Sequence, residues 1–547
     1  MQRVEVRVSD LIEPGLAIGG PHGSGEPMVL RAPWDGAELA RIPTTTMDDL
    51  DGVLTRARAA AEGYRWFPAW KRAAILERAS HLIDENAEQI ARIIAAEGGK
   101  PLKDARGEAK RGAGTFRWAS EEAKRTAGEI IEMDADPSGE DRFGWTIREP
   151  RGVIAAISPF NFPLNLVAHK VAPALAGGNA VVLKPASNTP LTALRLAELL
   201  AEAGLPDGVL QVVVGSGATI GNKLVMDERT NMVSFTGSPP VGRQIARDAG
   251  MKMVTLELGN NSATIVDEDA NLDLAVQRVV AGGFANSGQI CISVQRVVVH
   301  EKVYVEFMAM LLPQVAALTV GDPLDGATDV ASLVNEAETE RVKSWISEAV
   351  AQGATLATGG VRDDGRLLPT VLTEVTREMK VCAGEVFGPV LSILKARDLC
   401  EAIEISNDSD MGLQAGVFTN DLNKAMYAAR RLEVGGVMIN EVPTFRVDHM
   451  PYGGIKGSGI GREGIKYAIA EMTELKMVAI REMDWQTGGP PSDACLREPL
   501  GPRGRRARVP AVQHGLRGSD GQAAGAPGNT VGRGRPEPRG KEVGDID

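Results

Sequence analysis

The most constraining feature of the sequence is an alternation, between residues 152 and 258, of short apolar runs with segments long enough to form a helix. The runs are GVIAAIS, NAVVLKP, LQVVVG, MVSFTG and MVTLELG, and PLTALRLAELLAEAG lies between two of them. Runs that are apolar throughout and joined by helices are typical of buried strands in a parallel sheet with right-handed crossovers. The region is therefore predicted to be a doubly wound α/β domain, which binds ligands at the carboxyl ends of its strands.

A second α/β unit is predicted from about residue 260 to 460. VNEAETERVKSWISEAVAQG has helical character, and VQRVVVH, VLSILKA and GGVMIN have the composition of strands. Their alternation is less regular, so no strand order is predicted. Ahead of both units, AAILERASHLIDENAEQIARIIAAEGGKP carries its apolar residues on one stripe, which predicts a single amphipathic helix that ends at Gly98 and Gly99.

Residues 486–547 differ abruptly from the rest of the chain. Segments such as GPRGRRARVPAVQHG are rich in Gly, Pro and Arg and contain almost no large apolar side chains. Such a composition cannot bury enough apolar surface to offset the entropy of ordering, so a disordered tail is predicted. We interpret it as a functionless extension, and a regulatory or RNA-contacting arm is the alternative.

Charge and cysteine usage narrow the class of protein. The formal net charge is −12 and no basic stripe interrupts the first 485 residues, so nucleic acid is not an expected partner. The four cysteines are too scattered for a disulfide framework or a metal site. Because there is no signal peptide and no run of 18 apolar residues, we expect a cytoplasmic protein without a membrane partner.

Two polar side chains lie in segments that could carry chemistry. Cys291, in FANSGQICIS, is either a small apolar filler or a nucleophile. The loop after the first strand, SPFNFP, lacks the glycine pattern of an ordinary nicotinamide fingerprint. It holds Asn161 between two prolines, and this amide either bonds its own backbone or donates to an oxyanion.

Three other strand ends carry further candidates. Lys184, in LKPAS, is either a solvated charge or a contact for a phosphate or a ribose. Ser238 can cap a helix that Pro239 or Pro240 opens, and such a helix start can hold a pyrophosphate. Glu257, in the apolar run LELG, is either part of a structural ion pair or a general base whose pKa is raised by burial.

Seven motifs in one order resemble the aldehyde dehydrogenase superfamily over roughly residues 10 to 485. They are PFNFP, LKPAS, FTGS, LELG, NSGQICIS, EVFGP and MPYGGIKGSGIGREG. The resemblance implies NAD(P)-dependent oxidation of a small aldehyde to the acid. By the same resemblance Cys291 is the nucleophile, Asn161 and the backbone N–H of Cys291 hold the oxyanion, and Glu257 activates water against the thioester.

Two other functions remain open beside this one. A CoA-acylating semialdehyde dehydrogenase transfers the acyl group to CoA instead of water, and such members generally lack the glutamate in LELG. A catalytically silent structural protein on the same fold is the alternative from another class, and it has no need of Cys291, Asn161 and Glu257 together.

The resemblance also implies a cofactor, which is NAD or NADP. Many NAD-preferring members carry Glu at position 187, whereas Ser187 here does not repel a 2′-phosphate. The residues that match the family's cofactor contacts are Ser158, Pro159, Lys184, Ser187, Gly217, Phe235, Gly237, Ser238, Val241, Glu385 and Phe387.

For the substrate, the chain looks most like the branch that includes lactaldehyde, phosphonoacetaldehyde, succinate-semialdehyde and non-phosphorylating glyceraldehyde-3-phosphate dehydrogenases. An apolar tunnel for a short aliphatic or hydroxy-aldehyde is expected from Phe160, Phe162, Ile290, Ile292 and Phe445. The two isoleucines beside the nucleophile argue against a strong negative charge next to the carbonyl. Two further residues, Arg106 and Arg446, are either contacts for an anion or structural.

The family fold implies three parts and a subunit contact. Residues 1–141 and 152–258 are expected to bind NAD(P), and 259–460 to form the catalytic domain. Residues 142–151, as a two-stranded ribbon, and 461–485 are expected to form a small β bridging element. Because that element pairs subunits in the family, a homodimer or homotetramer is expected.

Overall fold

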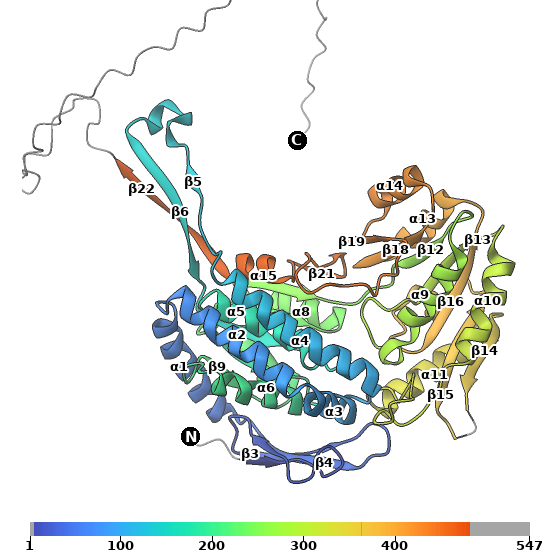
Figure 1. Cartoon of the computed structure of the whole chain (residues 1–547), viewed down its shortest axis with the longest axis horizontal. Coiled ribbons are helices and arrows are strands. Elements are labelled where there is room, and N and C mark those ends of the chain that lie inside the picture. Colours follow the sequence, from blue (N-terminus) through green and yellow to red (C-terminus); the bar gives the residue numbers. More distant parts are fainter. Residues whose placement is uncertain (1–4, 363, 482–547) are drawn as a thin grey trace, which may run out of the picture. The chain divides into compact units, whose positions relative to one another are not determined.

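The computed structural model describes residues 5–362 and 364–481, so the tail predicted to be disordered, 486–547, lies outside the described residues (Figure 1). The five apolar runs of the first unit form buried strands of one sheet, as predicted. In spatial order the strands are β9 (Leu210–Val212), β8 (Ala180–Lys184), β7 (Val153–Ile157), β10 (Met232–Thr236), β11 (Met253–Glu257) and β21 (Gly459–Ile460). The first five are parallel, and β21 pairs antiparallel with β11.

Helices cover both faces of this sheet. On one face lie α2 (Ala69–Glu85), α3 (Ala87–Gly98), α4 (Leu102–Glu122), α5 (Asn165–Ala176) and α6 (Leu191–Glu202). On the other lie α1 (Met47–Tyr64), α7 (Asn222–Met226) and α8 (Pro239–Asp248). Ile154 and Ala156 pack in the first core, and Val153 and Ala155 pack in the second. Since successive strand residues point to opposite faces, this alternation identifies a doubly wound sheet.

The prediction of a single amphipathic helix ahead of the sheet is wrong, because the segment forms two helices, α2 and α3, that are separated at Asn86. Asn86 has φ −105° and ψ 15°, and its side-chain amide donates to the carbonyl oxygen of Leu82 at 2.8 Å. An Asn side chain that bonds the preceding turn competes with the helical backbone bonds. The predicted end is confirmed, since Gly99 takes a left-handed conformation with φ +66°.

The second unit is also built on a parallel sheet. Its order is β14 (Thr355–Val361), β15 (Leu367–Thr373), β16 (Val390–Ala396), β13 (Arg296–His300), β12 (Ala263–Val266), β18 (Gln414–Phe418) and β19 (Gly436–Ile439), with only β14 antiparallel to its neighbour. Around it pack α9 (Leu272–Phe284), α10 (Tyr304–Ala316), α11 (Glu336–Ala351), α13 (Leu399–Asn407) and α14 (Leu422–Arg431). The predicted helix and three strands of this unit are all present.

A third, smaller sheet contains the segment expected to be a ribbon. It consists of β5 (Ile130–Ile131), β6 (Arg142–Pro150) and β22 (Thr473–Arg481), so it has three strands rather than two. Strands β6 and β22 pair antiparallel along their whole length, from Arg142 opposite Arg481 to Pro150 opposite Thr473. In Figure 1 these strands extend beyond the helices that surround the first sheet.

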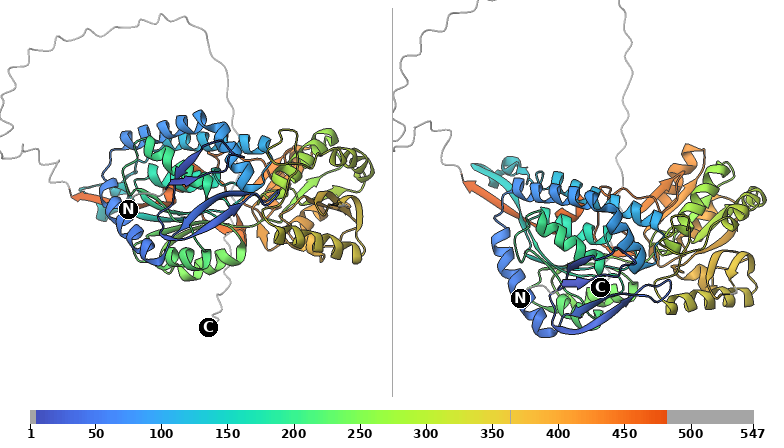
Figure 2. Two further views of the ribbon diagram at one scale, coloured as in Figure 1. Left: turned by 90° about the horizontal axis from the view of Figure 1, so that it is seen from below. Right: turned by 60° about the horizontal axis from the view of Figure 1, so that its bottom comes forward.

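The N-terminal segment forms two hairpins, and one of them reaches the second unit. The tip between β3 (Gly25–Arg31) and β4 (Glu38–Thr44) places Trp34 under the guanidinium of Arg366, 3.4 Å from the ring centroid (Figure 2). The other short elements are β1 (Glu5–Arg7), β2 (Ala17–Gly19), β17 (Met411–Gly412), β20 (Ile455–Lys456), α12 (Lys380–Ala383) and α15 (Ile465–Glu471). Within residues 5–362 and 364–481, no helix is long and apolar enough to cross a membrane.

Candidate active site

A cavity of about 370 Å³ lies at the carboxyl ends of β7, β10 and β11, where a doubly wound sheet binds its ligands. The second unit closes it from the opposite side. Its lining residues are Pro159, Phe160, Asn161, Leu166, Ala186, Thr236, Gly237, Ser238, Leu258, Gly259, Cys291, Glu338, Arg341, Glu385 and Phe387. The structure thus brings Cys291 and Asn161 together with five of the predicted cofactor contacts.

An unusual turn places Cys291 at this cavity. After α9, three consecutive residues adopt left-handed backbone angles: Asn286 (φ +48°), Ser287 (φ +55°) and Gly288 (φ +74°). The side chain of Asn286 donates to the carbonyl oxygens of Asn161 and Gln289, at 3.2 and 3.3 Å. Asn tolerates this conformation better than most residues, and the bonds of its side chain compensate for its cost.

The thiol of Cys291 lies among apolar side chains and beside one hydroxyl. Ile290, Ile292 and Leu413 are buried around it, and Phe162 packs against the same cluster. The hydroxyl oxygen of Tyr452 is 3.0 Å from the sulfur. Burial raises the pKa of Cys291 to about 12, even though the hydrogen bond with Tyr452 lowers it.

The amide of Asn161 is buried and held in place. Its nitrogen donates to the carbonyl oxygen of Gln289 at 2.8 Å, which occupies one of its two N–H groups. The side chain shares the cavity lining with Cys291. This geometry suits the predicted role of Asn161 as a donor to an oxyanion on the carbon that the sulfur attacks.

Glu257, the last residue of β11, is 2% exposed, and neither carboxylate oxygen has a hydrogen-bond partner among the described residues. The carboxylate lies against Gly453, where a β-carbon would approach Oε1 to 2.9 Å. Burial, and then the charge of Glu463, raise the pKa of Glu257 well above its ordinary value. A buried carboxyl group without partners and with a raised pKa suits a general base.

Several of the predicted cofactor contacts gather at this cavity. Pro159, Gly237, Ser238, Glu385 and Phe387 line the cavity. Helix α8 begins at Pro239, as predicted, and the Ser238 side chain makes no capping bond. Pro239 and Pro240 have no N–H, and the N–H of Gly242 donates to the carbonyl oxygen of Ser238, so the N–H of Val241 is the one in this first turn that stays available for an anion. At the other end of the cavity Glu385 accepts from the backbone N–H of Asn260 at 3.0 Å, and burial raises its pKa to about 7.

Two aromatic rings and one hydroxyl group also favour a bound ligand here. Phe387 has φ +51° and meets Phe160 edge to face, with centroids 5.9 Å apart. The buried hydroxyl of Ser158 has no partner in the described part of the chain. A ligand is the ordinary reason for a strained residue and an unpaired polar atom to coincide.

The remaining predicted contacts do not line the cavity. Burial lowers the pKa of Lys184 to about 8, and its ammonium group donates to the carbonyl oxygen of Pro185 at 3.1 Å. Ser187 donates to the carbonyl oxygen of Gly215 at 3.2 Å, and Phe235 packs so closely on Gly237 that a β-carbon there would collide with its ring. Two others are exposed: Gly217 begins a short π-helix, Gly217–Gly221, and Val241 lies in the first turn of α8.

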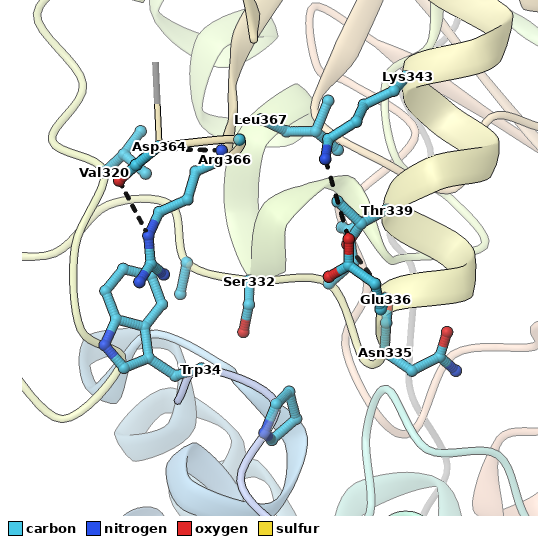
Figure 3. A pocket seen from close by; sticks show the side chains of 14 residues that line it. Trp34, Val320, Ser332, Asn335, Glu336, Thr339, Lys343, Asp364, Arg366 and Leu367 are labelled. Carbon is cyan, nitrogen blue, oxygen red and sulfur yellow. Dashed lines mark hydrogen bonds and ion pairs between the residues drawn. The ribbon is translucent and has the colours of Figure 1, made fainter. Parts of the chain in front are cut away.

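A second cavity, of about 250 Å³, lies between the β3–β4 tip and α11 (Figure 3). Its cations are already neutralised: Lys343 is 2.7 Å from Glu340, and Arg366 pairs with Asp364 at 3.3 Å. None of the residues predicted to be catalytic or to bind a cofactor lines it. It is therefore not the candidate active site.

Comparison with known proteins agrees with the geometry of the first cavity. Residues 21–478 match the model of the aldehyde dehydrogenase family. The chain belongs to this family. It is 47% identical over 467 residues to a 3-sulfolactaldehyde dehydrogenase of Priestia aryabhattai, covering 85% of this chain and 98% of that one. It is 40% identical over 469 residues to a lactaldehyde dehydrogenase of Methanocaldococcus jannaschii, covering 85% and 100%.

A solved structure supports the same conclusion. Glyceraldehyde-3-phosphate dehydrogenase GapN of Methanocaldococcus jannaschii, complexed with NADP, superimposes with a TM-score of 0.81 at 39% identity, covering 84% of this chain and 99% of that one. Solved members with this fold hold NADP or NAD. The protein is therefore an NAD(P)-dependent aldehyde dehydrogenase that oxidises small aldehydes.

In this aldehyde dehydrogenase the predicted substrate residues fall into two groups. Phe162, Ile290 and Ile292 surround the nucleophile, as expected. Arg106 does not approach the cavity, because it lies on the exposed face of α4 and makes two 2.8 Å hydrogen bonds with Glu88. Phe445 is 42% exposed and is absent from the cavity lining.

Arg446 has the structural role that was the alternative to an anion contact. It is buried, bonds the carboxylate of Glu463 at 3.0 Å and stacks 3.7 Å from the ring centroid of Tyr452. Its partner Glu463 also pairs with the buried Lys170 at 3.3 Å. Burial opposes ionisation of Glu463, but these two cations outweigh it and lower its pKa to about 2.

The structure adds site residues that the sequence reasoning did not assign. Tyr452 and Glu463 lie within MPYGGIKGSGIGREG, a motif that identified the family but assigned no role to either residue. Arg341 lines the cofactor cavity and donates to the carbonyl oxygen of Val386 at 2.7 Å. No pattern in the sequence distinguishes it from a solvated cation of a helix. Lys170 lies in a helix that is otherwise largely apolar, and a lysine in such a segment indicates a buried ion pair.

Proposed function

We propose that this enzyme converts short 2-hydroxyaldehydes, of the lactaldehyde type, into carboxylic acids through a thioester on Cys291. The observation that carries the proposal is the convergence of Cys291, Asn161 and a set of cofactor contacts on one cavity, beside the buried and unpartnered Glu257. The relatives act on aldehydes named lactaldehyde and 3-sulfolactaldehyde, both of which carry a hydroxyl group on the carbon next to the carbonyl.

In the first half of the reaction, the Cys291 thiolate adds to the aldehyde carbon. The oxygen of the resulting thiohemiacetal becomes an oxyanion, which the Asn161 amide stabilises by donating its second N–H. Glu385, Phe387 and the start of α8 would hold the nicotinamide ribose, the ring and the pyrophosphate. When bound, the cofactor supplies the acceptor for the two electrons and the hydrogen that leave the aldehyde carbon.

In the second half, water hydrolyses the thioester. Glu257 takes a proton from the attacking water, the carbon–sulfur bond breaks, and Cys291 is released as a thiolate with the carboxylic acid as product. Among the described residues no group bonds the Glu257 carboxylate, which supports this role because both of its oxygens can receive the water proton. A CoA-acylating reaction needs no such base, and so Glu257 argues for water.

Both cofactors are compatible with the site. The hydroxyl of Ser187 is turned to the Gly215 carbonyl, and no carboxylate at this position repels a 2′-phosphate.

For the domains, we propose that residues 1–141 with 152–258 form the cofactor-binding part, 259–460 the catalytic part, and 142–151 with 461–485 the bridging part.

We also propose that the bridging sheet pairs subunits into a dimer or tetramer in the cytoplasm. Exposed apolar side chains on β5 and β22 support the pairing, among them Ile130 at 69% and Leu475 at 58% exposure. The described cysteines are all free, and Cys291 has to remain a thiol to react, which supports a reducing compartment.

The test is turnover with purified enzyme, lactaldehyde and either NAD or NADP, in the absence of CoA. We expect reduction of the cofactor by the wild type and by Cys400→Ala, a matched control at an exposed free cysteine, but not by Cys291→Ala. A requirement for CoA, or turnover by Cys291→Ala, would contradict the proposal.

A further inference from the structure

Tyr452 is held rigidly beside the reactive sulfur. It is 3% exposed, and its backbone exchanges two hydrogen bonds with Glu463, at 3.0 and 2.7 Å. The guanidinium of Arg446 lies 3.7 Å from its ring centroid and is itself fixed by Glu463. The backbone pairing with Glu463 and the stacked Arg446 side chain thus hold the ring in place, and its hydroxyl has little freedom to leave its position.

The Tyr452 hydroxyl is a polar group in an otherwise apolar cluster. Ile290, Ile292 and Leu413 fill the space around it, and Met450 and Phe162 pack against the same cluster. Among the described residues, its hydrogen-bond partner is the Cys291 sulfur, 3.0 Å away. In the free enzyme the hydroxyl therefore depends on that sulfur for its hydrogen bond.

Addition of the aldehyde weakens this pairing. The sulfur bonded to the substrate carbon has neither the proton of a thiol to donate nor the charge of a thiolate, and a thioether sulfur is a weak acceptor. A buried hydroxyl left without a partner destabilises the intermediate. The oxygen of a hydroxyl group on C2 of the substrate lies three bonds from the sulfur, and it comes within reach of the Tyr452 oxygen, which is 3.0 Å from that sulfur in the free enzyme.

We infer that Tyr452 is a specificity-determining residue whose hydroxyl bonds the C2 hydroxyl of the substrate and so selects 2-hydroxyaldehydes over aldehydes that lack this group. The inference rests on the proposed function. It names the feature of the substrate that the site recognises, and it assigns that recognition to one oxygen atom. Sites built to bond a substrate hydroxyl reject the analogue without it, because their own polar group is then left unpaired.

The experiment compares lactaldehyde with propanal, which differ only by the C2 hydroxyl, in the wild type and in Tyr452→Phe. We expect the wild type to favour lactaldehyde in kcat/KM by at least about tenfold, and Tyr452→Phe to lose most of this preference, because its kcat/KM falls much more for lactaldehyde than for propanal. Tyr427→Phe is the matched control, because Tyr427 also lies beside a cysteine, Cys400, at 3.8 Å. Its preference should equal that of the wild type.

A role of Tyr452 in ionising the thiol would give a different result. In that case Tyr452→Phe would lower kcat/KM equally for both aldehydes and slow the alkylation of Cys291 by iodoacetamide, and the inference would be wrong. A preference that survives in Tyr452→Phe would overturn it as well.

A second measurement needs no variant. The wild type should favour lactaldehyde over 3-hydroxypropanal, whose hydroxyl is one carbon further from the sulfur, and equal values would overturn the inference. Oxidation of propanal and lactaldehyde at the same kcat/KM would overturn the inference alone. Failure to oxidise either aldehyde with NAD or NADP would overturn the proposed function, and the inference with it.

Discussion

At the scale of single residues, burial governs the chemistry of Cys291 and Glu257. Both are ionisable groups whose charged forms are disfavoured by their surroundings, and the pKa of each is raised. The neighbouring Glu463 has the opposite fate, because Lys170 and Arg446 hold it ionised. Two carboxyl groups of one site thus have pKa values far apart, which is the arrangement that lets one of them exchange protons during turnover.

Replacement of Glu257 should separate the two halves of the reaction. Glu257→Gln keeps the shape of the side chain but cannot accept a proton, so we expect a burst of reduced cofactor followed by turnover slowed about 100-fold or more. Stopped-flow absorbance measures both. Glu88→Gln, on the exposed surface beside Arg106, is the control. Loss of the burst would mean that Glu257 acts before the thioester forms.

The raised pKa of the nucleophile predicts the pH dependence of its alkylation. Only the thiolate reacts, and a pKa of about 12 means that its fraction grows about tenfold for each unit of pH across the neutral and mildly alkaline range. The rate of Cys291 alkylation by iodoacetamide in the free enzyme should rise accordingly from pH 7 to 10. A rate that levels off below pH 8 would show that the thiol ionises more easily than its burial implies.

At the scale of elements, the turn from α9 to β13 sets the position of the nucleophile. Its left-handed residues end at Gly288, where a β-carbon would overlap the carbonyl group of Gly388. Close backbone contact and φ +74° both require glycine at this position. The reactive cysteine therefore depends on a turn that is costly to form and that its neighbours hold in place.

The substitution Gly288→Ala should disturb this turn. We expect a loss of about 2 kcal/mol or more in the free energy of unfolding, together with a large loss of activity. Gly250→Ala is the matched control, since Gly250 is also left-handed (φ +62°) but has nothing within 4 Å of a β-carbon. It should cost about 1 kcal/mol and leave activity unchanged. Denaturant unfolding and initial rates compare the two, and equal effects would rule out the backbone clash.

At the scale of the whole molecule, the site exists because two sheets meet. The first sheet supplies Asn161, Glu257 and the start of α8, and the second unit supplies Cys291 and Glu385. Neither sheet alone encloses the cavity. The third sheet contributes no residue to the cavity lining, and its exposed apolar side chains suit a contact with another subunit.

Charges on that sheet should weaken the association of subunits. Leu475 and Met477 alternate along β22 and so share one face, at 58% and 45% exposure. Their joint replacement by Lys should shift the enzyme toward monomers in analytical ultracentrifugation. Leu422→Lys, at a 75% exposed position on α14, should not. An unchanged mass for the β22 variant would place the subunit contact elsewhere.

Much of the architecture could be predicted from local patterns. Continuous apolar runs identified the five parallel strands, helical periodicity and a glycine identified where α3 ends, and seven motifs identified the family and the cavity residues Cys291 and Asn161. These features depend on residues near one another in the chain. The break at Asn86 is also local, but it depends on a single side-chain hydrogen bond to Leu82. The spacing of apolar residues carries no information about such a bond.

The set of elements, the family and the residue types able to do the chemistry all follow from the order of amino acids. Which of those residues meet depends on how the chain packs in three dimensions. Arg106 and Arg446 looked alike as candidates, yet one pairs with Glu88 at the surface and the other is buried against Glu463. The contact between Cys291 and Tyr452 joins positions 161 residues apart. Such partners are chosen by packing between distant segments, which leaves no periodicity or spacing in the chain to reveal them.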